Sequence, residues 1–407
     1  MARVAILHDH DFVFKNDHDR RLKMQAKKKM TDLRNIYMIV MGGTMGDRKP
    51  LVILSVLAAS TLQEEEHKMS QIYMGGDTIF KNVNGRSRRF LPHLVDTYAF
   101  LLKLIQLWDP KHQLILEDDF VDLPFESGLS MWAKNSVNQN ILDQPTPNQI
   151  YLDFGDNLGR NRFTSQMLVF RGEQSTFFGP IFLPLDVEWS NNLQTLKEFH
   201  DQPNAHFLVV AGSNKNPFQL QDMIQWIRDT HQTHSWKIIV AGYVNLKEIE
   251  YSDVKDRILV VKDYIEFEDL TRFADYFVTS CGAGSTTIAL ARGVPVTCSS
   301  GTGYDVAYNR SRLLELQLGV PYTETFADFM TSVQSDFAAC RRNALVAQKV
   351  LTLENKLMMQ NMKLFFHRLA TDSAFQSEVV STGNIPQQYA LPKLETYMHQ
   401  LSPCCVS

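Results

Sequence analysis

The stretch from Tyr276 to Cys298, YFVTSCGAGSTTIALARGVPVTC, decides the fold class of this 407-residue chain. Its first four residues are largely apolar and predict a buried strand, and a turn of small residues follows them. The apolar run that comes next predicts a helix closed by Gly293 and Pro295. This order of strand, small-residue turn and helix is typical of α/β domains built on a parallel sheet.

The same turn is a candidate anion site. The first backbone N–H groups of a helix have no partner within it, and the helix dipole there favours negative charge. The N–H groups from Gly282 to Thr286 would therefore hold a diphosphate without a metal ion. The alternative interpretation is that the glycines serve only to let the helix pack closely on the sheet.

The alternation of strands and helices begins well upstream of this stretch. Asn216 can cap a helix that has Pro217 at its first position. Such an alternation predicts a right-handed, doubly wound parallel sheet. The strands expected in it are residues 207–210, 237–240, 258–261, 276–279 and 294–298, and the apolar face of the helix comprises Leu220, Met223, Ile224 and Ile227.

The amino-terminal half alternates in the same way. Residues 36–41 predict the first parallel strand, residues 50–60 a helix and residues 70–74 the next strand. Residues 4–7 are apolar enough to add a strand. The basic run at 15–34 is typical of a solvated helical face, so the segment before the strand is interpreted as an extension.

Two domains are expected, because the chain is longer than a single hydrophobic core usually grows. Helices are expected to dominate residues 91–131, whereas residues 135–172 are polar and give no assignment. Residues 180–189 contain two prolines without periodicity and predict the linker between the domains. The expected organisation is an extension at 1–35, a first domain at 36–184, a second at 185–370, and a terminal helix and tail at 371–407.

The composition argues against several classes of protein. The chain is 44% hydrophobic and 21% charged with a formal charge of -4, so it lacks the positive charge that a nucleic-acid partner requires. Its most apolar stretch, residues 51–59, is far shorter than the ~20 residues of a membrane-spanning helix. The five cysteines match the spacing of neither a disulfide framework nor a zinc site, which favours a reducing compartment and a cytoplasmic protein. Histidines and aspartates at 8–18 are interpreted as solvated, so no metal is expected.

Two stretches resemble known families. TSCGAGST at 279–286, followed by ALARGVP at 289–295 and then Asp305 and Asn309, resembles the donor signature of UDP-glycosyltransferases, with similarity over residues 205–320. GTMGDRKP at 43–50 is similar to the GTRGDxxP turn that opens sterol and antibiotic glycosyltransferases. The resemblance implies an α/β fold of the GT-B kind: two Rossmann-like domains, parallel sheets with a cleft between them, an acceptor-binding first domain and a nucleotide-sugar-binding second domain.

The resemblance also assigns roles to single residues. Asp47 matches a general base near the acceptor hydroxyl; the alternative is that it caps the following helix. Tyr264 matches an aromatic residue that stacks on the nucleobase; the alternative is packing at a strand end. Asp305 would accept hydrogen bonds from sugar hydroxyls, and Ser213 would donate one to phosphate. The donor-binding set expected is Ser213, Tyr264, Ser280, Gly282, Ala283, Gly284, Ser285, Thr286 and Asp305.

Three positions depart from the family pattern. Ser280 stands where the family commonly has a histidine that holds the diphosphate, and Ile288 stands where many relatives have a glutamate for the ribose. Val306 replaces the glutamine that usually follows the acidic residue. These departures leave open a donor held differently, a non-catalytic relative that only binds nucleotide sugars, and an epimerase or hydrolase on the same scaffold.

The activity implied by the resemblance is inverting transfer of a hexose from a nucleotide diphosphate sugar, UDP-linked, to a hydroxyl of a small lipophilic acceptor such as a sterol, polyketide or lipid. The nucleotide sugar is a co-substrate, and no cofactor is implied. The last four residues, Cys404-Cys405-Val406-Ser407, fit a carboxy-terminal prenylation pattern that would direct the protein to membranes. The alternative for this segment is a frayed tail.

Overall fold

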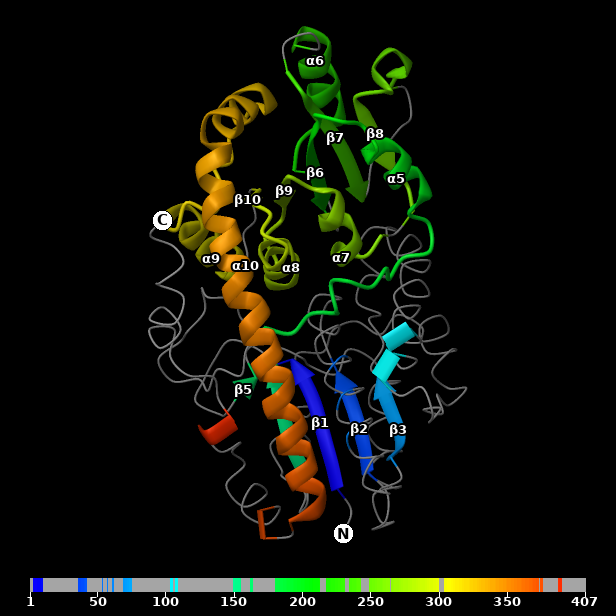
Figure 1. Cartoon of the computed structure of the whole chain (residues 1–407), viewed down its shortest axis with the longest axis vertical. Helices are drawn as coiled ribbons and strands as arrows, with labels where there is room; N and C mark the ends of the chain where they lie inside the picture. Colours follow the sequence, from blue (N-terminus) through cyan, green and yellow to red (C-terminus); the bar gives the residue numbers. More distant parts are fainter. Residues whose placement is uncertain are drawn as a thin grey trace, which may run out of the picture. The chain divides into compact units, whose positions relative to one another are not determined.

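A computed structural model of the chain describes two parallel sheets with their helices (Figure 1). The residues that it describes are 3–9, 36–41, 53, 57, 61, 69–74, 103–104, 107–108, 149–154, 162–163, 180–212, 217–230, 234–242, 249–263, 265–299, 304–372, 374–375 and 387–389.

The chain divides into two compact units. One comprises Met1–Phe182 together with Glu354–Ser407, and the other comprises Leu183–Leu353. The chain passes back into the first unit inside the 46-residue helix α10 (Phe326–Thr371). The observed boundary lies at residues 353 and 354, whereas a boundary near residue 370 was expected. Residues 326–371 contain no glycine or proline, so the sequence gives no signal for a boundary inside the helix.

The sheet of the first unit has the order β3-β2-β1-β4-β5, and every neighbouring pair is parallel. β2 (Ile36–Met41) and β3 (Met69–Met74) confirm the two strands predicted there. β1 (Arg3–Asp9) pairs with both β2 and β4 (Gln149–Phe154) and is central. The expectation that residues 4–7 could add a strand is confirmed, and residues 3–9 belong to this sheet.

Two strands of this sheet fall in the stretch that gave no assignment from sequence. β4 alternates apolar residues with Gln149, Tyr151 and Asp153, but it is only six residues long and lies in a stretch rich in polar residues, so the pattern was missed. The two-residue β5 (Arg162–Phe163) is too short to give a pattern. The predicted helix at 50–60 is represented by Ile53, Leu57 and Thr61, which are helical and buried. Their four-residue spacing places them on one face.

The second unit holds a five-stranded parallel sheet with the order β10-β9-β6-β7-β8. All five predicted strands are confirmed; two have the predicted bounds, and the other three differ by one or two residues at one or both ends. Val294 donates its N–H to the carbonyl oxygen of Ala289 (2.9 Å) and still belongs to the end of the preceding helix, so the last strand begins two residues later than expected. The strands are β6 (His206–Gly212), β7 (Trp236–Gly242), β8 (Ile258–Val261), β9 (Tyr276–Thr279) and β10 (Val296–Cys298).

Helices and 3-10 turns precede, connect and follow the strands of this sheet. They are α5 (Gln194–His200), α6 (Leu220–Thr230), α7 (Phe267–Leu270), α8 (Ala283–Ala291) and α9 (Tyr304–Glu315), with 3-10 turns η4 (Ser252–Val254), η5 (Thr271–Phe273) and, in the first unit, η6 (Gln387–Tyr389).

α6 buries the apolar face predicted for it, but it begins at Leu220 and not at Pro217. Phe218 explains the later start. Its ring stacks on Tyr322 and packs against Phe326 and Phe329, with centroids 4.9 to 5.1 Å away, so this residue serves an aromatic cluster outside the helix. The capping role predicted for Asn216 lies outside the described residues.

A buried polar network joins β9 to β10 at the centre of this core. Thr297 donates its hydroxyl to the carbonyl oxygen of Val320 (2.8 Å), so the Tyr276 hydroxyl donates to Thr297 (2.9 Å). Val320 in turn donates its N–H to the Tyr276 oxygen (2.8 Å). Burial raises the pKa of Tyr276, so the phenol stays neutral and able to donate. Every polar group in the network is satisfied, which fixes the two strands that carry the candidate site.

The predicted linker is fixed onto the second unit over part of its length. Asp269 accepts hydrogen bonds from the backbone N–H groups of Trp189 (3.0 Å) and Ser190 (2.6 Å). Arg272 donates to the carbonyl oxygen of Val187 (3.0 Å). Because Asp269 and Trp189 are buried, residues 187–190 belong to the packed body of this unit.

Candidate functional site

The order of the strands locates a binding region within the second unit. The chain runs from β6 outward through β7 to β8, then returns to place β9 on the other side of β6. In open α/β sheets, ligands bind at the carboxyl ends of the strands where the order reverses. Here that point lies between β6 and β9, which pair through Leu208 with Tyr276 and Val210 with Val278. β6 ends there at Gly212, and β9 is followed there by the turn at 280–282.

α8 begins directly after the turn at 280–282, and its first turn supplies the candidate anion site. Gly282 is the residue before the helix, with φ -59° and ψ 147°. The first helical hydrogen bond runs from the N–H of Thr286 to the carbonyl oxygen of Gly282 (3.2 Å). The N–H groups of Ala283, Gly284 and Ser285 precede it and have no acceptor within the helix. The sequence prediction is therefore corrected at Thr286, whose N–H is taken up by the helix.

Both glycines of the turn face open space. A Cβ built on Gly282 or on Gly284 meets no atom within 4 Å among the described residues. At Gly319, in contrast, a Cβ would lie 1.8 Å from the carbonyl oxygen of Val296, as expected for a glycine that allows close packing. The alternative that the turn glycines serve close helix–sheet packing is therefore not supported. The space beside them is available for a ligand to approach the backbone.

The hydroxyl groups of the turn hold the loop itself. Ser285 donates its hydroxyl to the carbonyl oxygen of Gly282 (3.1 Å), and Thr286 donates to the same oxygen (3.0 Å). Since the Ser285 proton is used in this way, Thr279 donates to the Ser285 oxygen (3.1 Å). Ser285 and Thr286 are both buried. Within the described residues, their side chains shape the anion site, and the backbone N–H groups are the part of it that a ligand can use.

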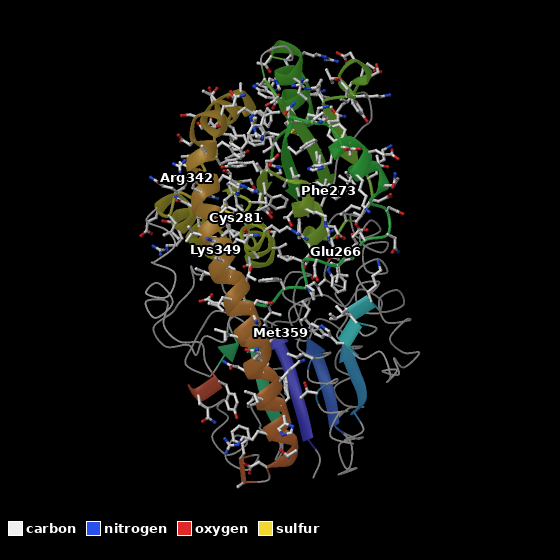
Figure 2. All side chains as sticks on the ribbon, viewed as in Figure 1. Glu266, Phe273, Cys281, Arg342, Lys349 and Met359 are labelled. Atoms are coloured by element: carbon white, nitrogen blue, oxygen red, sulfur yellow. A yellow bond between two sulfur atoms is a disulfide. The ribbon has the colours of Figure 1, made fainter. Side chains whose placement is uncertain are left out.

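Cys281 is the most constrained residue of the turn (labelled in Figure 2). Its φ of 63° lies in the left-handed region, which is strained for a residue other than glycine. A disulfide joins it to Cys298 at the end of β10, with the two Cα atoms 5.1 Å apart. Asn309 of α9 donates to its carbonyl oxygen (3.0 Å). These two restraints hold the backbone just ahead of the anion site.

The disulfide overturns the prediction that the cysteines carry no disulfide, and it removes the argument for a reducing compartment. The spacing of Cys281 and Cys298 gave no signal, because the pair depends on β9 and β10 lying side by side. Cys281 lies in the turn after β9 and Cys298 at the end of β10, with the whole of α8 between them in sequence. Cys340 is buried and free, and burial raises the pKa of its thiol.

Arg310 brings a positive charge that sequence reasoning missed. Ser280 is half-buried and cannot supply the charge of the family's histidine. Ser299 donates its N–H to the carbonyl oxygen of Thr279 (2.8 Å), next to Ser280, and Arg310 donates to the carbonyl oxygen of Ser299 (2.8 Å). A guanidinium is thus tied to the same strand ends as the anion site. Its position directly after Asn309 of the quoted motif was the signal available in the sequence.

Several predicted site residues are only partly described. Asp47, Ser213 and Tyr264 lie outside the described residues, so their roles remain predictions. Ala283 and Asp305 are described as helical residues, in the first turns of α8 and α9. Across the described ranges, no three His, Cys, Asp or Glu side chains come together as metal ligands. In the same ranges, no helix combines the length and the apolar character that crossing a membrane requires.

Comparison with known proteins gives similarity in structure alone. No family model matches the sequence, and no curated protein matches it. The chain is similar to the glycosyltransferase SnogD from Streptomyces nogalater, at 13% identity and a TM-score of 0.47 over 89% of this chain and 99% of that one. It is similar to a UDP-glucose: anthocyanidin 3-O-glucosyltransferase solved with UDP, at 12% identity and a TM-score of 0.46 over 90% and 99%. Similarity to CalG4, the calicheamicin glycosyltransferase, has 13% identity and a TM-score of 0.44 over 91% and 100%.

Proposed function

We propose that this chain is a glycosyltransferase that moves a hexose from a UDP-linked sugar to a hydroxyl of a small lipophilic acceptor, with inversion at the anomeric carbon. The observation that carries the proposal is the accessible start of α8. Three backbone N–H groups, at Ala283, Gly284 and Ser285, lie at the switch point of a parallel sheet and beside two glycines that face open space.

The order of motifs supports a sugar nucleotide over a free phosphate. The anion site lies within TSCGAGST, which resembles a UDP-glycosyltransferase donor signature, and GTMGDRKP at 43–50 resembles the acceptor-side turn of related enzymes. Ser213 follows β6, the strand next to β9, and would donate to the same diphosphate. Tyr264 would stack on the uracil, and Asp305 would accept hydrogen bonds from the sugar hydroxyls.

The chemistry follows from these groups. Asp47 accepts the proton of the acceptor hydroxyl as its oxygen attacks the anomeric carbon from the side opposite the leaving group. A new carbon–oxygen bond forms while the bond from the anomeric carbon to the diphosphate breaks, and UDP leaves with the electron pair. The N–H groups at the start of α8 stabilise the charge that develops on the diphosphate, because they are fixed before the reaction begins. Arg310, tied to the same strand ends, adds a positive charge nearby.

A donor panel tests the proposal against its alternatives. The full chain is incubated with UDP-linked and other nucleotide sugars, with and without sterol, polyketide and lipid acceptors. Diphosphate release and glycosylated products are followed by mass spectrometry. Product that requires both substrates supports the proposal. Consumption of the donor without an acceptor identifies an epimerase or hydrolase, and binding without turnover identifies a non-catalytic relative.

A further inference from the structure

The exposed side of α10 carries positive charge without compensating negative charge. From residue 337 to 371 the sequence contains one acidic residue, Glu354, and that residue is fully buried. Lys349, Lys356 and Lys363 are exposed and recur every seven residues, which places them on one side of the helix. Arg342 is exposed one interval earlier (labelled with Lys349 in Figure 2). None of these four cations forms an ion pair among the described residues.

Apolar side chains are interleaved with these cations. Leu345 and Val346 are each 41% exposed, and Leu364 is 61% exposed. Val346 lies four residues after Arg342, and Leu364 lies next to Lys363, so the apolar and basic side chains share the same side of the helix. We call Arg342, Leu345, Val346, Lys349, Lys356, Lys363 and Leu364 the α10 stripe. The part of α10 before residue 354 and the part after it belong to different units, and each part carries both exposed cations and exposed aliphatic side chains.

We propose that the α10 stripe docks this protein on an anionic phospholipid surface. Basic side chains attract acidic headgroups, and interleaved aliphatic side chains enter the boundary between headgroups and acyl chains. Within each unit, the part of α10 that belongs to it presents basic and aliphatic side chains together. The stripe contains no aromatic side chain that could stack on a base, which favours lipid over single-stranded nucleic acid.

A basic patch is one of the signals that attach a protein to an anionic membrane, and the α10 stripe has that composition. The stripe acts independently of sugar transfer.

Flotation with vesicles tests the stripe by itself. The full chain is produced in bacteria and mixed without nucleotide with vesicles of phosphatidylcholine alone or with 30% phosphatidylserine. Binding to the anionic vesicles, and its loss in 0.5 M NaCl, is expected. Lys349→Gln/Lys363→Gln should weaken it roughly 25-fold, since each cation near such a surface contributes about 1 kcal/mol. The matched control is Lys197→Gln/Lys255→Gln, which removes the same charge from exposed lysines elsewhere and should change little.

A second variant separates lipid from other polyanions. Leu364→Ser should weaken vesicle binding by about tenfold, because it withdraws one aliphatic side chain from an apolar layer. It should leave any binding to a duplex oligonucleotide unchanged. Equal binding to neutral and anionic vesicles, equal effects of the two lysine double variants, or binding to the oligonucleotide but not to vesicles would each overturn the proposal. Failure to bind UDP would not affect this result, so the two proposals fail separately.

Discussion

The side-chain amide of Asn309 donates a 3.0 Å hydrogen bond to the carbonyl oxygen of Cys281, and both residues are fully buried. This bond ties α9 to the turn between β9 and α8. Cys281 has a left-handed backbone that is costly for a non-glycine residue, so it persists only where the surroundings fix it. Asn309 thus positions the backbone from which the N–H groups of the anion site extend.

Asn309→Ala should lower the free energy of unfolding by about 1–3 kcal/mol, because the buried Cys281 oxygen loses its donor. It should also weaken UDP binding. The measurements are urea unfolding and calorimetric titration. The matched control is Asn343→Ala, where the lost bonds to the carbonyl oxygens of Leu316 and Gln317 are longer, at 3.2 and 3.3 Å, and partly exposed. If both variants lose the same stability, Asn309 has no special positioning role.

Replacing Gly319 or Gly284 of the second unit with alanine should change the stability in opposite directions. Gly319→Ala places a methyl group 1.8 Å from the carbonyl oxygen of Val296, so the backbone must move and stability should fall by about 3 kcal/mol or more. Gly284→Ala meets only open space in the first turn of α8 and should be neutral or stabilising by up to about 1 kcal/mol. Thermal unfolding of both variants measures this contrast. A strong loss at Gly284 would show that the turn is packed after all.

Opening the disulfide should destabilise the second unit. It closes a loop of 17 residues, and a cross-link of that length is worth about 3 kcal/mol through the entropy of the unfolded chain. The denaturation midpoint should therefore fall on addition of a reductant. Cys298→Ser should show the lower midpoint without reductant and no further change with it. Identical midpoints for oxidised and reduced wild-type protein would mean that the cysteines are not joined in solution.

The sequence was most informative where buried strands and an amphipathic helix repeat regularly. All five strands of the second sheet and the buried face of α6 could be predicted, because long apolar runs and a 3.6-residue period reflect burial directly. β1 could be anticipated as a strand at residues 4–7, but its central place in the sheet could not, because that place depends on its neighbours β2 and β4. β4 and β5 were not predicted, because they are short and lie in a stretch rich in polar residues.

The candidate site also has one part that could be predicted from the sequence and one part that could not. The glycine turn and the start of α8 are local in sequence and could be predicted from it. The Cys281–Cys298 bond, the amide of Asn309 and the guanidinium of Arg310 depend on which strands and helices become neighbours. The family motif includes Asn309, but a motif does not reveal that its amide holds the carbonyl oxygen of Cys281.

Asp47→Asn tests the proposed general base. Asparagine caps a helix about as well as aspartate, so stability should barely change. General-base catalysis contributes about 10²- to 10⁴-fold, so turnover should fall by that order while donor binding stays near its original value. Steady-state kinetics with the best donor and acceptor, together with UDP titration, measure both effects. Turnover close to that of the wild type would assign Asp47 to helix capping alone.

Calorimetric titration of UDP into wild-type protein and Gly284→Leu tests the anion site most directly. The leucine side chain would occupy the open space beside the first turn of α8, so folding should be preserved while the backbone N–H groups are blocked. A lost hydrogen bond to a charged group is worth about 1.5–3 kcal/mol, so the affinity should fall about tenfold or more. Unchanged UDP affinity in a folded Gly284→Leu protein, or no UDP binding by the wild type, would contradict a diphosphate site at the start of α8.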